Sequence, residues 1–506
     1  MQAVPLSPAS TPSDVPGMPT IVPHEAPTPG RRIADDMLYS AASTSREVRM
    51  SQNTTIGRRL SVLTDAFRTQ LWPMPSLAIV VAIALGVSLP LVDGHIDDGL
   101  PEGVLAYLFS GGADAARAVL GAVAGSLVTM TTLTFSLTVV TLQLASGQFS
   151  PRLLRTFTSD RFVHGTLALF LATFVYTLTV LRSVRTDTAD QSEFVPQISL
   201  TLAFVLALAS VMGLVLFLAH LAREIRVETM LKRVHAEAEG TVRRVVPERD
   251  PASRPVELPE VPPYAVPLLA EASGFVTALD EERMLAAAVE ADAVVLVEST
   301  PGASLVVGSP FGFAWPRSGR TLERDAADQL RRQVASAVSV HYEHTAAQNV
   351  SYGLRQLTDV VNKALSTGIN DPTTAVHTLA HSSALLCELA TRDLGPSVRR
   401  DDHGVTRVVS MLPGLNDLLD LAMGGPRRYG AGDPDVVARL FVLLRELAWS
   451  TDQPAHRAAV RDQLERLAAT AEAQDFDVTD RERMRHLRRH VEDALRGEWR
   501  PDHQGG

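Results

Sequence analysis

The chain has 506 residues, enough for two or three domains, and a formal net charge of −10. No basic stripe offsets this negative charge, so composition argues against a nucleic-acid partner. A single cysteine, Cys387, excludes an intramolecular disulfide, and nothing points to an oxidising compartment.

The N-terminal segment lacks the features of a folded domain or a signal peptide. Residues 1–30 are rich in Pro, Ser and Thr and have few apolar clusters. They have neither a basic start nor a compact apolar core. We therefore expect a disordered N-terminal tail over residues 1–50.

Four stretches are apolar over the roughly 20 residues that a membrane-spanning helix needs. They cover 71–92, 116–145, 163–181 and 197–221. The sequence thus predicts an α-helical polytopic membrane protein, with a four-helix transmembrane domain over 55–245. The second stretch is the longest, so its helix must tilt or project beyond the bilayer.

Charges at the ends of the spans predict their orientation. Basic residues gather before the first span, between the second and third, and after the fourth, whereas acidic residues are frequent in the alternate segments. By the positive-inside rule, both termini are cytoplasmic. Between the second and third spans, we expect contact with anionic lipid headgroups from Arg152, Arg155 and Arg161.

The second span carries two polar stripes when it is placed on a helix at about 100° per residue. The inner stripe, as we name it, consists of Thr131, Thr134, Thr138 and Thr141. The outer stripe lies nearly opposite and consists of Thr129, Thr132, Ser136 and Gln143.

Two interpretations of these stripes remain open. Hydroxyls can bond to carbonyls of their own helix and help helices pack, and Gly121 and Gly125 form a GxxxG pattern upstream. Alternatively, one stripe packs within the subunit and the other faces a symmetry mate or a water-filled path. Uncharged hydroxyls suit small ions, because they replace hydration without trapping the solute.

Two histidines lie near the same predicted cytoplasmic level as Gln143. His164 begins the third span and His220 ends the fourth. Ionisable residues at such positions predict either a vestibule with a pH-sensing role or simple anchoring at the membrane interface.

The C-terminal half predicts a cytoplasmic α+β part. A helix continues from the fourth span through residue 239, and a Pro-rich linker follows over 246–263. A small β-rich module is expected over 264–320, and a cytoplasmic helical domain over 321–497. The module weakly resembles the small β-sandwich of lipoyl and biotinyl carriers. It lacks the lysine that a swinging cofactor needs, so the likeness concerns fold alone.

The helical domain breaks once, at the segment STGINDP. Gly368 fits a helix C-cap, and Asp371 followed by Pro372 fits an N-cap and first-turn proline, with Asn370 in the elbow. The alternative is a binding elbow, in which the helix N-terminus and the hydroxyls of Thr373 and Thr374 hold an anion.

No constellation points to catalysis. His377 and His381 lie one helical turn apart but lack the glutamate of an HExxH motif, so we predict no metal site. A GxSxG motif, a Walker loop and GxGxxG are missing from the sequence. We expect neither an enzyme nor a cofactor.

Two segments resemble a known family. LQLASGQFSPRLLR after the second span and YGLRQLTDVVNKALSTGINDPTTA are similar to bacterial predicted membrane proteins of the domain of unknown function 2254 family, over roughly residues 55–450. This chain has Ser366 and Thr367 where such proteins often have Ser-Pro. The resemblance implies a bacterial cytoplasmic membrane and a shared architecture, but no activity.

We expect a homo-oligomer in the lipid bilayer whose four-span units form a pathway for small ions or solutes, gated by the cytoplasmic domain. The alternative is a membrane-anchored sensor or scaffold, in which the spans only pack and the cytoplasmic domain binds an unknown ligand or protein partner.

Overall fold

The structure is a computed structural model that describes residues 72–96, 111–148, 160–186, 193–224, 226–249 and 258–499. The predicted tail over 1–50 lies outside these residues, as do Arg152 and Arg155. The predicted linker lies only partly within them.

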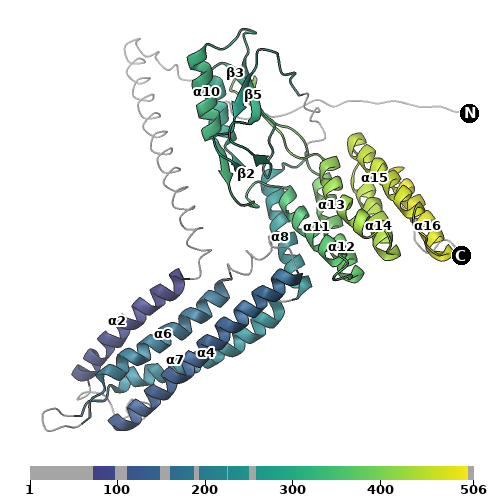
Figure 1. Ribbon diagram of the computed structural model, residues 1–506. Helices are drawn as coiled ribbons and strands as arrows, with labels where there is room; N and C mark the ends of the chain where they lie inside the picture. The colour runs from purple at the N-terminus through teal and green to yellow at the C-terminus, as the bar shows by residue number, and fades with distance from the viewer. Residues whose placement is uncertain are drawn as a thin grey trace, which may run out of the picture. The chain divides into compact units, whose positions relative to one another are not determined.

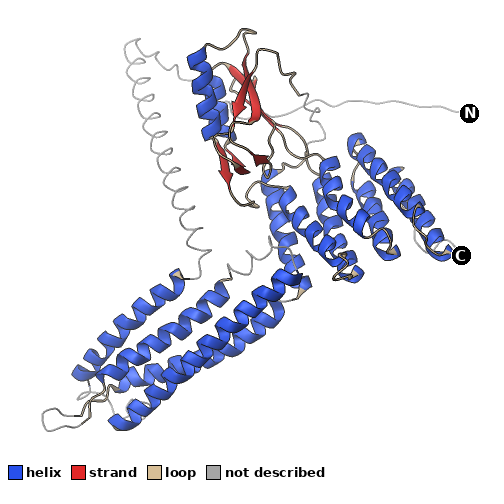
Figure 2. Cartoon of the chain, viewed as in Figure 1, coloured by secondary structure: helices blue, strands red, loops and turns tan. Residues whose placement is uncertain are grey.

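Four long apolar helices occupy the four predicted spans (Figure 2), which confirms this part of the expected architecture. Each is long and apolar enough to cross a membrane. They are α2 (Pro73–Ile96), α4 (Ala113–Gln148), α6 (Arg161–Ser183) and α7 (Gln197–Glu224).

Helix α6 is the centre of this bundle and packs against α2, α4 and α7. Half of its apolar window is buried, compared with 17–22% for the other three helices. The small core between the helices includes Leu120, Tyr176 and Leu200. The outer faces of α2, α4 and α7 thus keep broad apolar surfaces that the described residues do not cover.

Carboxylates from neighbouring segments cap two helix N-termini at one end of the bundle. Asp93 of α2 accepts hydrogen bonds from the backbone N–H groups of Ile198 (3.1 Å) and Ser199 (3.0 Å), and from the Ser199 hydroxyl (2.7 Å). Glu193 accepts one from the N–H of Ala113 at 2.7 Å. These N–H groups have no partner within their own helices, so the carboxylates satisfy them.

The predicted continuation of the fourth span as one helix was wrong. Helix α7 ends at Glu224, and α8 (Val227–Val245) begins after Arg226, whose backbone is extended (φ −70°, ψ 131°). Residues Met230, Leu231 and Val234 of α8 belong to the core of the C-terminal helices. The sequence has no helix breaker here, so only the packing of α8 reveals the break.

The β strands form two sheets (Figure 2, red). The five-stranded sheet has the order β1-β5-β3-β8-β7, and the three-stranded sheet has the order β4-β2-β6. Among the described strands, only β3 and β8 pair in parallel, with Val295 opposite Val408. The bounds are β1 (Val266–Leu269), β2 (Gly274–Leu279), β3 (Ala293–Val297), β4 (Ser304–Leu305), β5 (Pro310–Pro316), β6 (Val338–His341), β7 (Ser397–Arg400) and β8 (Thr406–Ser410).

This arrangement differs from the expected carrier-like sandwich. Helices α9 (Glu281–Glu290) and α10 (Arg324–Ser336) pack on the strands: α9 contacts β3 and β8, and α10 contacts β1 and β6. Figure 1 shows α10 at the side of the strands. Strands β6 and β7 come from the range 321–497, which the sequence predicted as a helical domain. Strand β8 lies more than a hundred residues after β3 in the chain. This separation leaves ample room for the crossover connection that a parallel pair needs.

The remaining helices share one hydrophobic core with α8. They are α11 (Ser351–Ala364), α12 (Pro372–Ala390), α13 (Leu415–Tyr429), α14 (Pro434–Ser450), α15 (Pro454–Glu472) and α16 (Val478–Leu495). Apolar side chains recur along one face of each helix, which places residues such as Leu386, Leu444 and Val491 at full burial.

Candidate functional site

The inner stripe of α4 faces the interior of the bundle. Thr134 is 0% exposed and Thr141 is 6% exposed. The hydroxyls of Thr131, Thr138 and Thr141 each donate to the carbonyl four residues earlier, at 2.8 Å. The Thr134 hydroxyl is buried and has no hydrogen-bond partner among the described residues. The inner stripe therefore packs against this chain's own helices.

Hydroxyls also occupy the contact between α6 and α7. Thr173 and Ser210 are both fully buried, with 3.4 Å between their hydroxyl oxygens. Each also donates to a carbonyl of its own helix, at 2.7 Å for Thr173 and 2.8 Å for Ser210. Small hydroxyl side chains thus fill helix contacts in this bundle, as the packing interpretation expects.

The outer stripe of α4 is exposed along its whole length: Thr129, Thr132, Ser136 and Gln143. Gly121 and Gly125 continue it toward the start of α4, and a Cβ added to either glycine would meet nothing within 4 Å. The hydroxyls of Thr129 and Thr132 donate to Gly125 and Val128 carbonyls, at 3.3 and 2.9 Å. Among the described residues, a face of polar and small side chains therefore stays uncovered on an otherwise apolar helix.

His220 is paired with a carboxylate that the sequence analysis did not single out. Its Nε2 lies 2.6 Å from Oδ2 of Asp160, and its ring contacts that of Phe162, with centroids 4.6 Å apart. Asp160 also caps α6, because its Oδ1 accepts the Phe162 N–H at 2.9 Å. The sequence could have pointed to Asp160, because an aspartate directly before the third span is a typical N-cap residue.

Glu224 extends this group of side chains. Ligand atoms of Asp160, His220 and Glu224 lie within 4.8 Å of one another, close enough for a shared cation. However, Glu224 forms an ion pair with Arg233 at 2.6 Å, and Asp160 is used by the helix cap and His220. The arrangement is that of a hydrogen-bonded ion network at the junction of α6, α7 and α8.

Two further predicted residues, His164 and Arg161, have different surroundings. His164 is 5% exposed and buried in the bundle. The structure does not place it in the group formed by Asp160, His220 and Glu224. Arg161 is exposed at the first position of α6, and its contact with lipid headgroups stays a prediction.

The elbow before α12 confirms two predictions and corrects one. Asp371 caps α12, accepting from the Thr374 N–H (3.0 Å) and hydroxyl (2.5 Å), and Pro372 is the first helical residue. The Thr374 hydroxyl and N–H hold the pKa of Asp371 below its usual value. Gly368 is not the C-cap: α11 ends with Leu365 at that position. The left-handed residue is Asn370 (φ 51°), because asparagine tolerates this backbone conformation.

The Asp371 carboxylate fills the position that the alternative gave to a bound anion. Thr373 is exposed, and the Thr374 groups are used by Asp371. The geometry of this elbow is that of a helix cap. Anion binding there stays a prediction with no supporting contact among the described residues.

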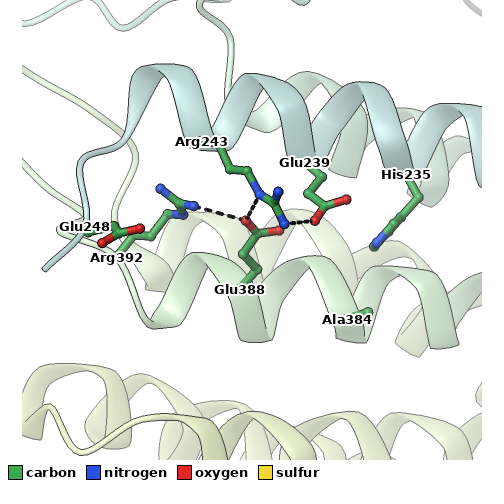
Figure 3. Close-up of a pocket in the computed structure, with 7 residues that line it drawn as sticks. All are labelled: His235, Glu239, Arg243, Glu248, Ala384, Glu388 and Arg392. Atoms are coloured by element: carbon green, nitrogen blue, oxygen red, sulfur yellow. Dashed lines mark hydrogen bonds and ion pairs between the residues drawn. The ribbon is translucent and has the colours of Figure 1, made fainter.

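Helices α8 and α12 run side by side in the same direction and border an open groove of about 610 Å³ (Figure 3). Arg243 contacts Glu239 and Glu388, and Arg392 contacts Glu388 at 3.2 Å. Arg392 also donates to the Val246 carbonyl at 2.9 Å. The groove alternates acidic and basic groups, so it offers hydrogen bonds and charge to a polar ligand.

Comparison with known proteins identifies the family. Residues 68–446 match the family described as "Predicted membrane protein (DUF2254)". The uncharacterized proteins Rv1290c of Mycobacterium tuberculosis and Mb1321c of Mycobacterium bovis are each 33% identical over 430 residues, which cover 84% of this chain and 80% of each relative. No solved structure matches the chain. Because the similarity spans most of both lengths, the chain belongs to the predicted membrane protein (DUF2254) family.

Proposed function

We propose that this protein is a multi-pass protein of the bacterial cytoplasmic membrane with both termini in the cytoplasm. Copies of the chain assemble around α4 and form a pathway for small cations, lined by the outer stripe. The observation that carries this proposal is the exposed polar face of α4, which the described helices of the bundle leave uncovered.

Exposing the polar outer stripe of α4 to lipid is unfavourable, and this supports assembly of several copies of the chain. Helices in a membrane associate through small and hydroxyl residues, because these let backbones approach closely and form hydrogen bonds. Gly121 and Gly125 have open space beside them, which suits a close contact with α4 of another copy. The polar residues that follow would then face the axis between copies.

Hydroxyl geometry supports a cation rather than an anion. Thr129 and Thr132 use their single proton to bond the carbonyl four residues earlier. A threonine hydroxyl has one donor and two acceptor positions, so what remains for a solute is oxygen lone pairs. Such oxygens substitute for the hydration shell of a small cation.

A matched pair of variants tests the pathway in proteoliposomes. Thr129→Val, Thr132→Val and Ser136→Ala together remove the outer hydroxyls with little change of volume. We expect flux of K⁺ or Na⁺ through the wild type and a loss of at least about tenfold in this variant. The control, Thr131→Val, Thr138→Val and Thr141→Val, removes inner-stripe hydroxyls and should keep the flux.

Other outcomes count against the proposal. Equal flux in wild type and outer variant, with both folded and assembled, would show that the stripe is not the lining. No flux in the wild type over a range of pH and salt would favour the second candidate function.

The second candidate is a membrane-anchored sensor or scaffold, favoured by the charged groove between α8 and α12. A polar ligand there would interact with groups such as Arg243 and Glu388. Screening small anionic and zwitterionic metabolites for a rise in melting temperature, with Arg243→Ala as the comparison, tests this function. A ligand that stabilises both proteins equally binds elsewhere.

A further inference from the structure

An open cavity of about 440 Å³ lies between α2 and α6, near the C-terminal ends of both helices; we call it the α2–α6 cavity. The two helices pack tightly at Gly86, because a Cβ at this glycine would lie only 2.8 Å from Cβ of Thr179. One turn further along, Pro90 of α2 and Arg182 of α6 line the cavity. The cavity therefore follows directly on a close contact between two of the apolar helices.

Two arginines line the α2–α6 cavity. Arg182 lies in the last turn of α6, and Arg185 follows the end of that helix. Both are exposed, and neither guanidinium has an ion pair or hydrogen bond to another described residue. The backbone of Arg185 is held in place, because its N–H and carbonyl pair with those of Phe194 at 3.0 and 3.1 Å. Phe194 also lines the cavity, so this bridge keeps Arg185 beside it.

The described lining of the cavity contains no carboxylate that could neutralise these arginines. At this end of the bundle, Asp93 and Glu193 accept N–H groups of helix N-termini, at 2.7–3.1 Å. The hydroxyls of Thr179 and Ser183, in the lining, donate to carbonyls of their own helix at 2.7 and 2.6 Å. The cavity thus offers a ligand chiefly two guanidinium groups, which are cations and donate hydrogen bonds only.

Guanidinium groups are suited to phosphate. Their planar arrangement of N–H donors forms two parallel hydrogen bonds with phosphate or carboxylate oxygens. Two such groups in a lining without acids favour a ligand with net negative charge. A zwitterionic ligand would bring an ammonium group that finds no acidic partner in the described lining.

The α2 side of the cavity favours a lipid over a soluble anion. Val87 and Leu91 line the cavity and are 48% and 64% exposed. Earlier on the same helix, Val80 and Ile83 are exposed as well. A soluble phosphate gains nothing from this apolar surface, whereas a phospholipid can lay an acyl chain against it. Basic pockets between membrane helices bind anionic headgroups in this way.

We propose that the α2–α6 cavity binds an anionic phospholipid, whose phosphate is held by Arg182 and Arg185. Val87 and Leu91 contact one of its acyl chains. This inference rests on the proposed insertion of the apolar helices in the membrane. It does not depend on the cation pathway, because the outer stripe of α4 takes no part in the cavity. Its test measures lipid binding and not flux, so either proposal can fail without the other.

The test uses the full-length protein purified in detergent, and native mass spectrometry to count the lipids that stay bound. Phosphatidylglycerol and phosphatidylcholine with identical acyl chains are compared, so that the headgroups alone differ. We expect one phosphatidylglycerol per chain to bind at least about tenfold more tightly than phosphatidylcholine. Arg182→Gln together with Arg185→Gln should remove this preference.

The matched control is Arg161→Gln together with Arg223→Gln, which removes two exposed arginines at the opposite end of the bundle. It changes the net charge equally and should keep the tightly bound phosphatidylglycerol. Because Arg182 and Arg185 are exposed, their double variant should keep the circular dichroism and the lipid-free melting temperature of the wild type. Equal binding of the two lipids by the wild type, or tight binding that survives substitution of Arg182 and Arg185, would overturn the proposal.

A second arm separates a lipid from a soluble phosphate ester. Glycerol 3-phosphate has a phosphate group but no acyl chains, so at millimolar concentration it should leave phosphatidylglycerol bound. If it displaces the lipid from the wild type, the cavity binds a soluble phosphate and the assignment to a phospholipid is wrong.

Discussion

The side chain of Asp371 caps the N-terminus of α12. It accepts two hydrogen bonds from Thr374, and these bonds favour its ionised form. Asp371→Ala should weaken the first turn of α12 by about 1 kcal/mol, the usual effect of losing an N-cap. Faster hydrogen exchange in peptides covering residues 371–378, with unchanged exchange in α14, would be the expected result.

The same residue predicts a pH dependence with a definite sign. Because folding lowers the pKa of Asp371, its ionised form adds stability above the unfolded pKa of about 3.9. That contribution disappears as pH falls through the folded pKa. Asp371→Asn keeps a capping oxygen but cannot ionise, so its exchange in α12 should exceed that of wild type at pH 6. The difference should shrink only below about pH 4, as pH falls through the folded pKa, and a difference that stays constant down to about pH 2 would contradict the assignment.

Cys387 gives a second prediction at the scale of one residue. Burial raises the pKa of its thiol, and Ser450 and Ser383 are its hydrogen-bonding neighbours. The thiolate is the reactive form, so Cys387 should react slowly with a maleimide at pH 7.5 in the folded protein. Denaturant should increase the rate at least about tenfold. Rapid labelling without denaturant would show that this part of α12 opens easily.

At the scale of helices, the close contact between α11 and α8 at Gly353 gives a prediction. A Cβ at this position would lie 2.2 Å from Cβ of Ala238 on α8. Gly353→Ala must push the two helices apart, at a cost of about 1–3 kcal/mol. A Cβ at Gly240, also on α8, would meet nothing within 4 Å. Gly240→Ala should stabilise by up to about 1 kcal/mol.

Denaturant unfolding of the full chain, followed by far-ultraviolet circular dichroism, compares the two glycine variants. The midpoint should fall for Gly353→Ala and stay level or rise for Gly240→Ala. A fall in both would mean that added volume is not the cause, and that the α8–α11 contact has been placed wrongly.

Elements with strong local signals could be predicted from the sequence. The four apolar helices could be predicted from the length of the apolar stretches. The start of α12 at Asp371 and Pro372 could be predicted from the residue preferences of helix N-termini. The prediction of Gly368 as a C-cap was wrong. It relied on the general preference for glycine at helix C-termini, but here α11 ends at Leu365 and the left-handed residue is Asn370. Angular spacing on α4 separated the two stripes correctly, but it holds no information on which one the neighbouring helices cover.

Interactions between distant segments escaped prediction. The pairing of β8 with β3 depends on strands far apart in the chain, and so does the packing of α8 on α11 and α12. The candidate sites share this property. Asp160 meets His220, and His235 meets His381, across 60 residues or more. Spacing on one helix revealed His377 and His381, but the contact of His381 with His235 becomes visible only once α8 is placed.

At the scale of the molecule, the charged residues at the two ends of the apolar bundle bear on its orientation. One end has the capping carboxylates Asp93 and Glu193, together with Arg182 and Arg185 of the α6 end. The opposite end has Arg161, Arg223 and Arg233, with the carboxylates Asp160 and Glu224 beside them. Basic residues accumulate on the cytoplasmic side of membrane proteins, so the basic residues at this end support the proposed cytoplasmic location of the C-terminal helices and sheets.

Cysteine labelling of intact cells tests this orientation, and slow labelling of Cys387 would keep the background low. Asp190→Cys lies in the segment between α6 and α7, and Asp402→Cys lies in an exposed turn between β7 and β8. A membrane-impermeant maleimide should label the first variant in intact cells, and the second only after the membrane is permeabilised. The reverse pattern would mean inverted insertion. Labelling of both would place these segments on the same side, which an odd number of crossings between them cannot produce.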